Sequence, residues 1–335
     1  MVSKTLELLA QFAERPVEEL ARVSKIYPFA LTPFIVGRVK EGTYSPAALR
    51  QFLPDIRELQ DNDGFISDPT GERDLHPEPG ILQTYDNRLA LIFSYQCLAY
   101  CRFCFRKAAV GPDHGVSDTE LERAFAYISA HTEIEDILLS GGDPLALPNK
   151  RLIPLLERLT SFPHLKAIRI DSRALNVHPA RLDDELLAFL EADGRFWYYA
   201  HLNHPDDLDH PEVIAAARRL LSARIPIYNQ SVILRGVNDD VETMKRLMNL
   251  CYFNKIIPYN LYVLDRVKGG AHFDVPINRV VEIYEALSHL SGPAQPLLVY
   301  VDEQSKKHRA IYDKTLDLRA FLETRNTPTK DLAVV

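Results

Sequence analysis

Residues 94–111 read SYQCLAYCRFCFRKAAVG and carry three cysteines in the spacing C-x3-C-x2-C, namely Cys97, Cys101 and Cys104. They follow directly on an apolar run, RLALIFS (88–94), which is typical of a buried strand. Three thiolates on one short loop can hold three irons of a [4Fe–4S] cluster and leave the fourth iron open to a small chelating molecule. We therefore predict a cluster site at the end of this strand.

The cysteines allow two other interpretations. A free cysteine is commonly a small buried apolar residue, and we interpret Cys251, at the end of an apolar helical stretch, in this way. Zinc is the second alternative, but structural zinc sites normally pair C-x2-C with further cysteines or histidines nearby. The position of the loop after a strand favours the cluster.

From residue 88 onward, short apolar runs alternate with longer amphipathic ones. Such alternation is typical of βα units around a parallel sheet, and without a G-x-G-x-x-G turn it favours a partial barrel over a dinucleotide-binding sheet. In barrels of this kind the chemistry lies at the carboxyl ends of the strands. The predicted strands are 88–94, 136–140, 166–170, 196–202, 225–234, 255–264 and 296–302, and the predicted helices include 117–131, 178–193, 210–223 and 240–251.

The fold class predicted is α/β, a partial (β/α)6-type parallel barrel with an N-terminal helical extension. We expect a helical and connector region at 1–85, the barrel at 86–302 and a C-terminal extension at 303–335. In the first region, residues 7–23 and 45–59 have helical apolar spacing, and 61–82 is a connector rich in Asp, Gly and Pro.

Composition excludes several classes of protein. The 335 residues are 46% apolar and 25% charged with a net charge of −7, which argues against a nucleic-acid surface and against disorder. There is no apolar run long enough to span a membrane and no apolar core of a signal peptide at the start. Four cysteines are too few for a disulfide scaffold, so we expect a cytoplasmic protein with reduced thiols.

A second motif, SGGDPL (140–145), follows the second predicted strand. Adjacent glycines such as Gly141 and Gly142 let the backbone approach a ligand closely, and Asp143 can balance an ammonium group. Alone, such a segment is usually no more than a turn. Its position one βα unit after the cysteine loop makes it a much more specific sign of a ligand-binding segment.

Together the two motifs resemble the radical S-adenosylmethionine superfamily, in which the Gly-Gly-acid segment meets the methionine end of the cofactor. Within it, the chain resembles the lysine 2,3-aminomutase family. The resemblance runs from about Tyr85 to Asp302, with weaker similarity upstream. It is carried by YCRFCFRKAAVG, LLSGGDPL, HLNHP (201–205), NQSVILRGVND (229–239) and PYNLYVLDRVKGGAHFDVP (258–276).

This resemblance implies an activity and its cofactors. Members use the cluster and S-adenosylmethionine to make a 5′-deoxyadenosyl radical, and the best-known ones move an amino group between adjacent carbons of lysine with the help of pyridoxal 5′-phosphate. It also implies a flavodoxin- or ferredoxin-type electron donor and self-association into a homo-oligomer.

The residues that handle the substrate match the family. Arg106 falls where the family binds the substrate carboxylate, and a guanidinium suits bidentate binding. Asp265 and Asp302 fall on two acidic positions that hold the distal amino group of lysine. Alone, each Asp could be an ordinary loop residue and Arg106 a solvated or phosphate-facing one. Three further residues match positions that line the S-adenosylmethionine site of the family: His201, Asn203 and Gln230. Each could otherwise be a polar residue of the barrel interior.

The residues that handle pyridoxal phosphate match less well. The family's glycine-rich stretch is replaced by DEQSKKHRAIYD (302–313), and the position of the lysine that attaches the cofactor is Arg309, which cannot act as an amine nucleophile. A histidine of the family's cysteine loop is replaced by Phe103, and an expected phosphate-binding arginine by Thr84. The candidates left for this cofactor are Lys306, Lys307, Tyr262 and Arg88.

Three hypotheses follow. In the first, the radical abstracts hydrogen from a lysine-like amino acid without pyridoxal phosphate and leads to elimination, epimerisation or oxidation. In the second, Lys306 or Lys307 binds pyridoxal phosphate in a rearranged loop and the protein is an aminomutase. In the third, the protein is an inactive scaffold, which the intact motifs disfavour. Modification of a lysine on a protein partner stays open within the first two.

Overall fold

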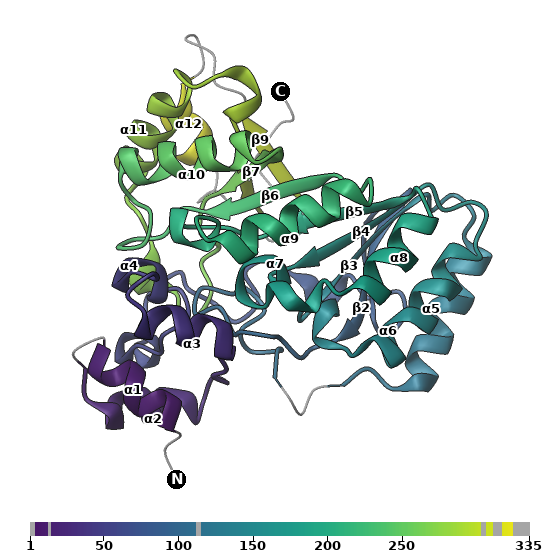
Figure 1. Ribbon diagram of the computed structural model, residues 1–335, viewed down its shortest axis with the longest axis horizontal. Helices are drawn as coiled ribbons and strands as arrows, with labels where there is room; N and C mark the ends of the chain where they lie inside the picture. The colour runs from purple at the N-terminus through teal and green to yellow at the C-terminus, as the bar shows by residue number, and fades with distance from the viewer. Residues whose placement is uncertain (1–3, 13–14, 112–114, 303–305, 311–316, 324–335) are drawn as a thin grey trace.

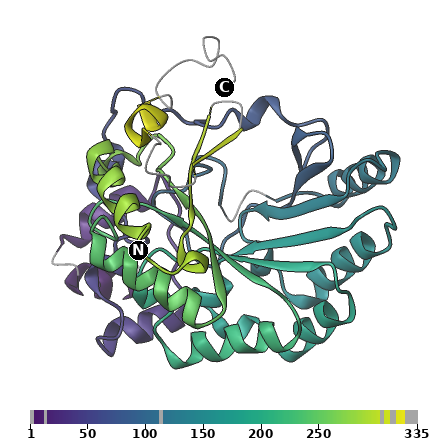
Figure 2. The ribbon, with the colours of Figure 1, turned by 90° about the horizontal axis from the view of Figure 1, so that it is seen from above.

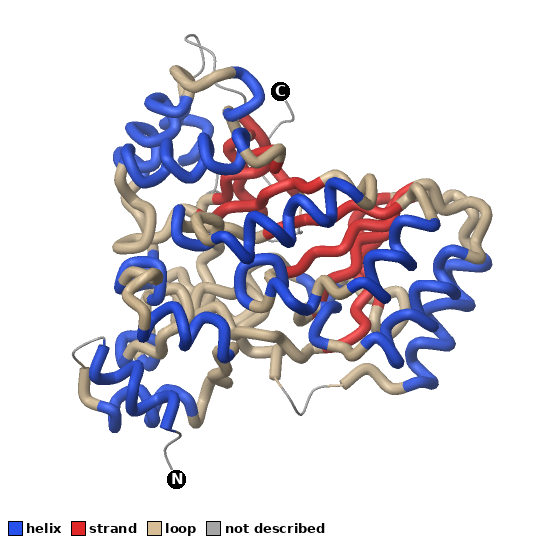
Figure 3. The backbone as a smooth tube through the Cα atoms, in the orientation of Figure 1, coloured by secondary structure: helices blue, strands red, loops and turns tan. Residues whose placement is uncertain are grey.

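One nine-stranded sheet forms the centre of the molecule, and its strands follow one another in the order β1 to β9 (Figures 1 and 3). The computed structural model describes residues 4–12, 15–111, 115–302, 306–310 and 317–323. The strands are β1 (Ile81–Tyr85), β2 (Arg88–Ser94), β3 (Asp136–Gly141), β4 (Ala167–Ser172), β5 (Phe196–Ala200), β6 (Ile227–Val232), β7 (Ile256–Tyr262), β8 (Leu297–Val301) and β9 (Lys307–Ala310).

The seven strands β2 to β8 are parallel, as the alternation of apolar and amphipathic runs predicts. The two outer strands were not predicted. β1 pairs antiparallel with β2 and lies partly in the expected connector, while β9 pairs antiparallel with β8 and carries the polar sequence KHRA. Edge strands of four and five residues leave too short a pattern to distinguish them from loops.

Helices between the strands cover the outer face of the curved sheet (Figure 2). They share one continuous apolar core with the outward-facing strand residues, among them Ile168 and Ile170 of β4. The intervening residues Arg169 and Asp171 face the other side, the barrel interior, because side chains alternate along a strand. The main helices are α5 (Asp118–Ala130), α6 (Asn149–Thr160), α8 (Asp184–Ala192), α9 (Pro211–Ser222), α10 (Val241–Phe253) and α11 (Ile277–Leu287). A short α7 (Ala174–Val177) follows β4, and α12 (Leu318–Glu323) adds Leu318 and Leu322 to the same core.

Four N-terminal helices form a second apolar cluster, purple in Figure 1, which includes Leu9, Leu20 and Phe52. They are α1 (Lys4–Phe12), α2 (Val17–Ser24), α3 (Pro33–Lys40) and α4 (Pro46–Leu49). This cluster attaches to loops at the carboxyl ends of the barrel strands, since Tyr44 donates a hydrogen bond to Asp207 at 2.5 Å. The N-terminal region therefore lies over the end of the barrel where the chemistry is expected.

The helix predicted over 45–59 is shorter than expected. Ser45 caps it through the Ala48 amide and Pro46 occupies its first turn, as predicted, but the helix ends at Leu49. Pro54 lacks an amide hydrogen, and Asp55 begins a separate 3-10 turn (Ile56–Leu59) with its own capping box from Glu58. The predicted stretch 7–23 likewise divides into α1 and α2, and Pro16 precedes α2.

The result is an open α/β barrel with an N-terminal helical region, which confirms the predicted fold class. Within the described part of the chain, no helix combines the length and apolarity needed to cross a bilayer.

Candidate active site

The cysteine loop leaves the carboxyl end of β2 and is held by the neighbouring strand end. The amide of Gly142 donates to the Ser94 carbonyl, and that of Asp143 to the Gln96 carbonyl, both at 2.8 Å. Gly141 has a φ of +106°, and a Cβ on it would overlap Ile92; a Cβ on Gly142 would overlap the Gln96 carbonyl. The two glycines are therefore required for the packing of β3 against the cysteine loop.

The three thiols of the loop are partly accessible and lie close enough to affect one another's ionisation. Burial raises the pKa of Cys97 well above its usual value, and the neighbouring Cys104 and other acidic groups add to this. Burial and then Cys101 raise the pKa of Cys104 to about 12. The guanidinium of Arg173 donates to Cys101 Sγ at 3.0 Å. Thiolates here need positive charge close by, which iron would supply.

The donor set of the loop suits a cluster. No three His, Cys, Asp or Glu side chains in the described residues are arranged to hold a single metal ion. Cysteine thiolates are the usual ligands of a [4Fe–4S] cluster, and the loop carries three thiols that are not in disulfides. The candidate ligands Cys97, Cys101 and Cys104 are each partly accessible, whereas Cys251 is buried.

Asp143 connects this loop with β4. Its Oδ1 accepts from the Leu145 amide at 2.9 Å and the Ser172 hydroxyl at 2.7 Å, and its Oδ2 accepts from the Arg173 amide at 2.9 Å. Burial raises the pKa of Asp143. These contacts fix the end of β4, and the predicted pairing with an ammonium group stays a prediction.

The three polar residues assigned to the S-adenosylmethionine site have different surroundings. The imidazole of His201 stacks on Phe103 with 5.6 Å between ring centroids, its Nε2 is buried without a hydrogen-bond partner, and burial lowers its pKa to about 3. Asn203 is fully buried, and its side chain bonds the Val232 amide and Gln51. Gln230 lies beside Tyr262, whose hydroxyl donates to it at 2.9 Å. Of the three residues, His201 has a buried polar atom left to take a ligand.

Arg106 lies at the carboxyl end of β3 but already has a carboxylate partner. Glu72, from the N-terminal connector, accepts two hydrogen bonds from it at 2.6 Å, and the Ser140 hydroxyl accepts a third at 2.9 Å. Glu72 raises the pKa of Arg106 despite burial of the guanidinium. Sequence reasoning missed Glu72, although it lies in DPTGE (68–72), one of the upstream segments with weaker similarity to the family.

Lys307 is the candidate amine that the structure places inside the barrel. Its Nζ donates to the Tyr262 hydroxyl at 2.5 Å, and that hydroxyl donates to Gln230 at 2.9 Å. Burial, followed by the cationic side chains of Arg169 and Arg309, lowers the pKa of Lys307 to about 8. Lys306, by contrast, is exposed.

Arg88 reaches the same region from the opposite edge of the sheet. Its guanidinium lies 3.7 Å from the centre of the Tyr85 ring, and the Tyr85 hydroxyl accepts from the Lys307 amide at 3.5 Å. The two edges of the open barrel therefore meet near Lys307.

Asp171 is an interior carboxylate that sequence reasoning missed. Burial raises its pKa to about 6, while Lys307 and Arg106 act in the opposite direction, so it lies under the influence of both cations. A signal was available, because Arg169, Asp171 and Arg173 alternate with apolar or small residues. A strand buried on both faces has no reason to alternate in this way unless it borders a polar interior.

The two predicted ammonium-binding carboxylates lie at strand ends. Asp302 directly follows β8, where it accepts from the Lys306 amide and pairs with His308 at 2.9 Å. Asp265 follows β7 and helps to raise the pKa of Tyr262, after burial and Asp171. Asp265 therefore acts on the group that contains Tyr262 and Lys307. The Asp302 carboxylate is engaged by His308, which stacks on Tyr300 of β8, so its contact with a distal ammonium stays a prediction.

Comparison with known proteins identifies the superfamily to which the chain belongs. Residues 91–248 match the Radical SAM superfamily. Together with the cysteine loop at the end of β2, this match defines a radical S-adenosylmethionine enzyme, whose cofactors are a [4Fe–4S] cluster and S-adenosylmethionine.

The curated relatives define the family. The chain is 33% identical to the L-lysine 2,3-aminomutase of Fusobacterium nucleatum over 88% of its own length and 69% of that relative. It is also 33% identical to the L-lysine 2,3-aminomutase of Escherichia coli K12, over 88% of this chain and 86% of that one. The chain belongs to the lysine 2,3-aminomutase family. Among solved structures, a radical SAM methyltransferase from Sphaerobacter thermophilus superposes with a TM-score of 0.48 at 18% identity, covering 66% of this chain and 68% of that one.

Proposed function

We propose that this enzyme is an aminomutase that acts on a lysine-like basic amino acid, with pyridoxal phosphate held covalently by Lys307. The observation that carries the proposal is the position of Lys307, whose amine lies inside the barrel against Tyr262 with its pKa lowered to about 8. A lysine is a nucleophile only when it is neutral, and a pKa near neutrality makes the neutral form available.

The surroundings of Lys307 also suit a phosphate. Arg169 and Arg309 both act on the pKa of Lys307, and Arg88 lies close by across the open edge. Arg169 is paired with Asp136 at 2.7 Å, while Arg309 is exposed and makes a 3.4 Å contact with the Tyr259 hydroxyl. Arg309, which stands at the family's lysine position, would therefore supply positive charge to the phosphate.

The cofactors supply the bond-breaking chemistry: when bound, S-adenosylmethionine and the cluster give the 5′-deoxyadenosyl radical, and pyridoxal phosphate carries the migrating nitrogen. The protein binds and orients the amino acid. The Arg106 guanidinium binds the carboxylate of the amino acid, either in place of Glu72 or alongside it. Asp265 and Asp302 bind its distal ammonium group. Tyr262 and Gln230 hold the Lys307 amine in place through their chain of hydrogen bonds.

A labelling experiment tests this function. Anaerobically reconstituted protein is incubated with pyridoxal phosphate, desalted, reduced with borohydride and digested. We expect a phosphopyridoxyl group on the peptide that contains Lys307, its loss in Lys307→Met, and its retention in Lys306→Met. Formation of 3,6-diaminohexanoate from lysine, in which the amino group has moved from C2 to C3, or of the corresponding product from an analogue, then completes the test.

A second candidate function is radical chemistry on the same amino acid without pyridoxal phosphate. It is favoured by Phe103, which packs with His201 and Phe273 where the family has a histidine, and by Thr84, which stands in β1 where an arginine is expected. Two results together would select this candidate and overturn the first. The protein would retain no pyridoxal phosphate, and its formation of 5′-deoxyadenosine would depend on a basic amino acid.

Enzymes of this superfamily use an electron donor. The flavodoxin- or ferredoxin-type donor, the homo-oligomer and the cytoplasmic location stay predictions from the sequence.

A further inference from the structure

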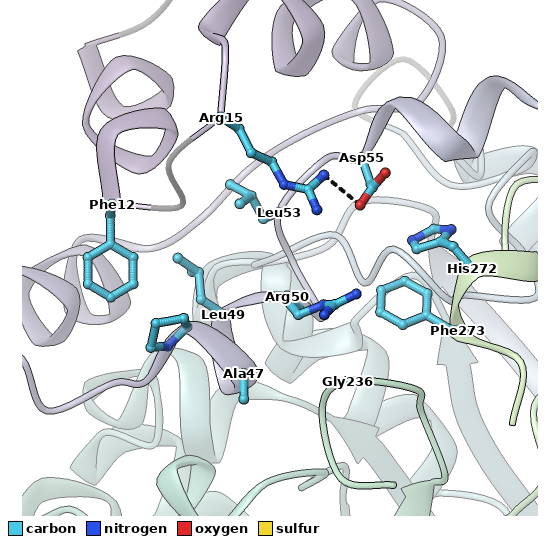
Figure 4. A pocket seen from close by; sticks show the side chains of 11 residues that line it. Phe12, Arg15, Ala47, Leu49, Arg50, Leu53, Asp55, Gly236, His272 and Phe273 are labelled. Atoms are coloured by element: carbon cyan, nitrogen blue, oxygen red, sulfur yellow. Dashed lines mark hydrogen bonds and ion pairs between the residues drawn. The ribbon is translucent and has the colours of Figure 1, made fainter.

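A cavity lies between the N-terminal helices and the loops that follow β6 and β7, outside the barrel interior. Figure 4 shows its walls: Phe12 of α1 and Leu49 of α4 lie on one side, and Gly236, His272 and Phe273 of the two loops on the other. Its volume is about 320 Å³. This is the lower end of the range for small-molecule sites, which is roughly 300 Å³ and upward.

The charges along this cavity do not balance. Asp55 is already shared by Arg15 and Arg57, each 2.6 Å from its Oδ2. Arg50 also lines the cavity, yet within the described parts of the chain its guanidinium has no hydrogen bond or ion pair. Burial and the repulsion of Arg57 and Arg15 lower its pKa. Among the described residues, the guanidinium groups of Arg15 and Arg50 therefore line the cavity with a single carboxylate, that of Asp55. Asp55 and Asp239 oppose the lowering of the Arg50 pKa without cancelling it.

His272 adds unpaired polar atoms to the same cavity. The residue is 8% exposed, and neither ring nitrogen has a hydrogen-bond partner. Burial lowers its pKa to about 4, so the ring is neutral near pH 7 and has one N–H to donate. A buried polar group without a partner costs free energy, and a ligand that accepts its hydrogen bond would remove this cost.

We propose that this cavity binds a small organic carboxylate with an apolar body. One unpaired guanidinium and one neutral imidazole suit a single negative charge, and a guanidinium binds a planar carboxylate through two parallel hydrogen bonds. The remaining walls, Phe12, Leu49 and Phe273, suit the apolar part. The site is separate from the group around Lys307. Phe273 connects it with the cysteine loop through an edge contact with Phe103 at 6.1 Å between centroids. Asp55 also connects it with that loop, because its amide donates to Glu58, the partner of Arg102.

The test uses the reconstituted full chain and two probes, 4-(trifluoromethyl)phenylacetate and its uncharged amide, with fluorine NMR as the readout. We expect the acid to bind at least about tenfold more tightly than the amide, because charge-assisted hydrogen bonds are the stronger ones. Arg50→Met should weaken binding of the acid by a similar factor, and His272→Phe by a smaller one. Arg218→Met, which changes an exposed arginine of α9, is the matched control and should bind like the wild type.

Three results would overturn the proposal. The first is equal binding of acid and amide. The second is unchanged binding in both Arg50→Met and His272→Phe. The third is displacement of the probe by S-adenosylmethionine, which would make the cavity part of the cofactor site. Thermal melts of the variants exclude misfolding, and Arg50→Lys, which keeps the charge, should recover part of the affinity if a variant is less stable.

Discussion

The two sides of the barrel mouth hold their functional groups in different ways. Around the cysteine loop, the end of β3 is fixed by backbone hydrogen bonds, and glycines at 141 and 142 leave no room for a side chain. Around β7 to β9, the candidate groups are held by side chains, as Tyr262 holds Lys307. Backbone packing tolerates little change of sequence, whereas contacts between side chains can be rearranged. This difference is consistent with the sequence-based expectation that the family's motifs are kept on the first side and altered on the second.

The strongest test of the first side is removal of a cluster ligand. Cys101→Ala should abolish the iron–sulfur absorbance and reduce cleavage of S-adenosylmethionine to background, because two thiolates cannot hold the cluster with one open iron. The absorbance spectrum and 5′-deoxyadenosine formation are measured on anaerobically reconstituted protein. Cys251→Ala, in the core of α10, is the control and should keep both. Unchanged iron–sulfur absorbance and 5′-deoxyadenosine formation in Cys101→Ala would overturn the assignment of Cys101 as a cluster ligand.

The packing of the glycine pair can be tested without the cofactor. Gly142→Ala should destabilise the protein by about 1–3 kcal/mol or more, because its Cβ would overlap the carbonyl of Gln96. A lower melting temperature or loss of soluble protein is the expected result. Gly194→Ala is the control, since a Cβ there meets nothing within 4 Å. Equal stability of the two variants would show that the strand end can shift.

The same contrast decides what could be predicted from the sequence. The seven parallel strands, the cysteine triad and the Gly-Gly-Asp segment are local patterns, and a local pattern is visible in one sequence. The pairing of Glu72 with Arg106 joins residues far apart in the chain and depends on where the connector crosses the barrel. Nothing in the spacing of either residue specifies it.

The choice between Lys306 and Lys307 required the register of an unpredicted strand. β9 pairs Lys307 with Val301 of β8, and this register turns Lys307 inward and leaves Lys306 exposed. Counting residues from Asp302 pointed to Arg309 instead. Asp171 was missed for a related reason: the strand predicted over 166–170 ends two residues too early, whereas β4 continues to Ser172.

The two carboxylates at the strand ends test how the altered side binds a substrate. Asp265→Ala and Asp302→Ala should each weaken binding of a diamino acid about tenfold or more, since a hydrogen-bonded ion pair to the distal ammonium is lost. Asp302→Ala also removes the partner of His308, so we expect the larger effect there. Apparent binding constants for lysine and for norleucine, which lacks the distal amine, are compared. A loss that is equal for both amino acids would assign the carboxylates a structural role only.

The smallest expected effect concerns the titration of Lys307. Its pKa is lowered to about 8, whereas an exposed lysine titrates at about 10.4. Reductive methylation modifies the neutral amine, so labelling of Lys307 should rise with pH and reach half its maximum near pH 8, where an ordinary lysine is under about 1% neutral. Asp171 opposes this lowering, because its negative charge favours the ammonium form. Asp171→Asn should therefore move the midpoint to lower pH, and mass spectrometry of the Lys307 peptide, with peptides of exposed lysines as the reference, measures it. A midpoint near that of the exposed lysines would mean that the Lys307 amine is solvated. The residues around β7 to β9 would then not keep it in the neutral form that reacts with a carbonyl group.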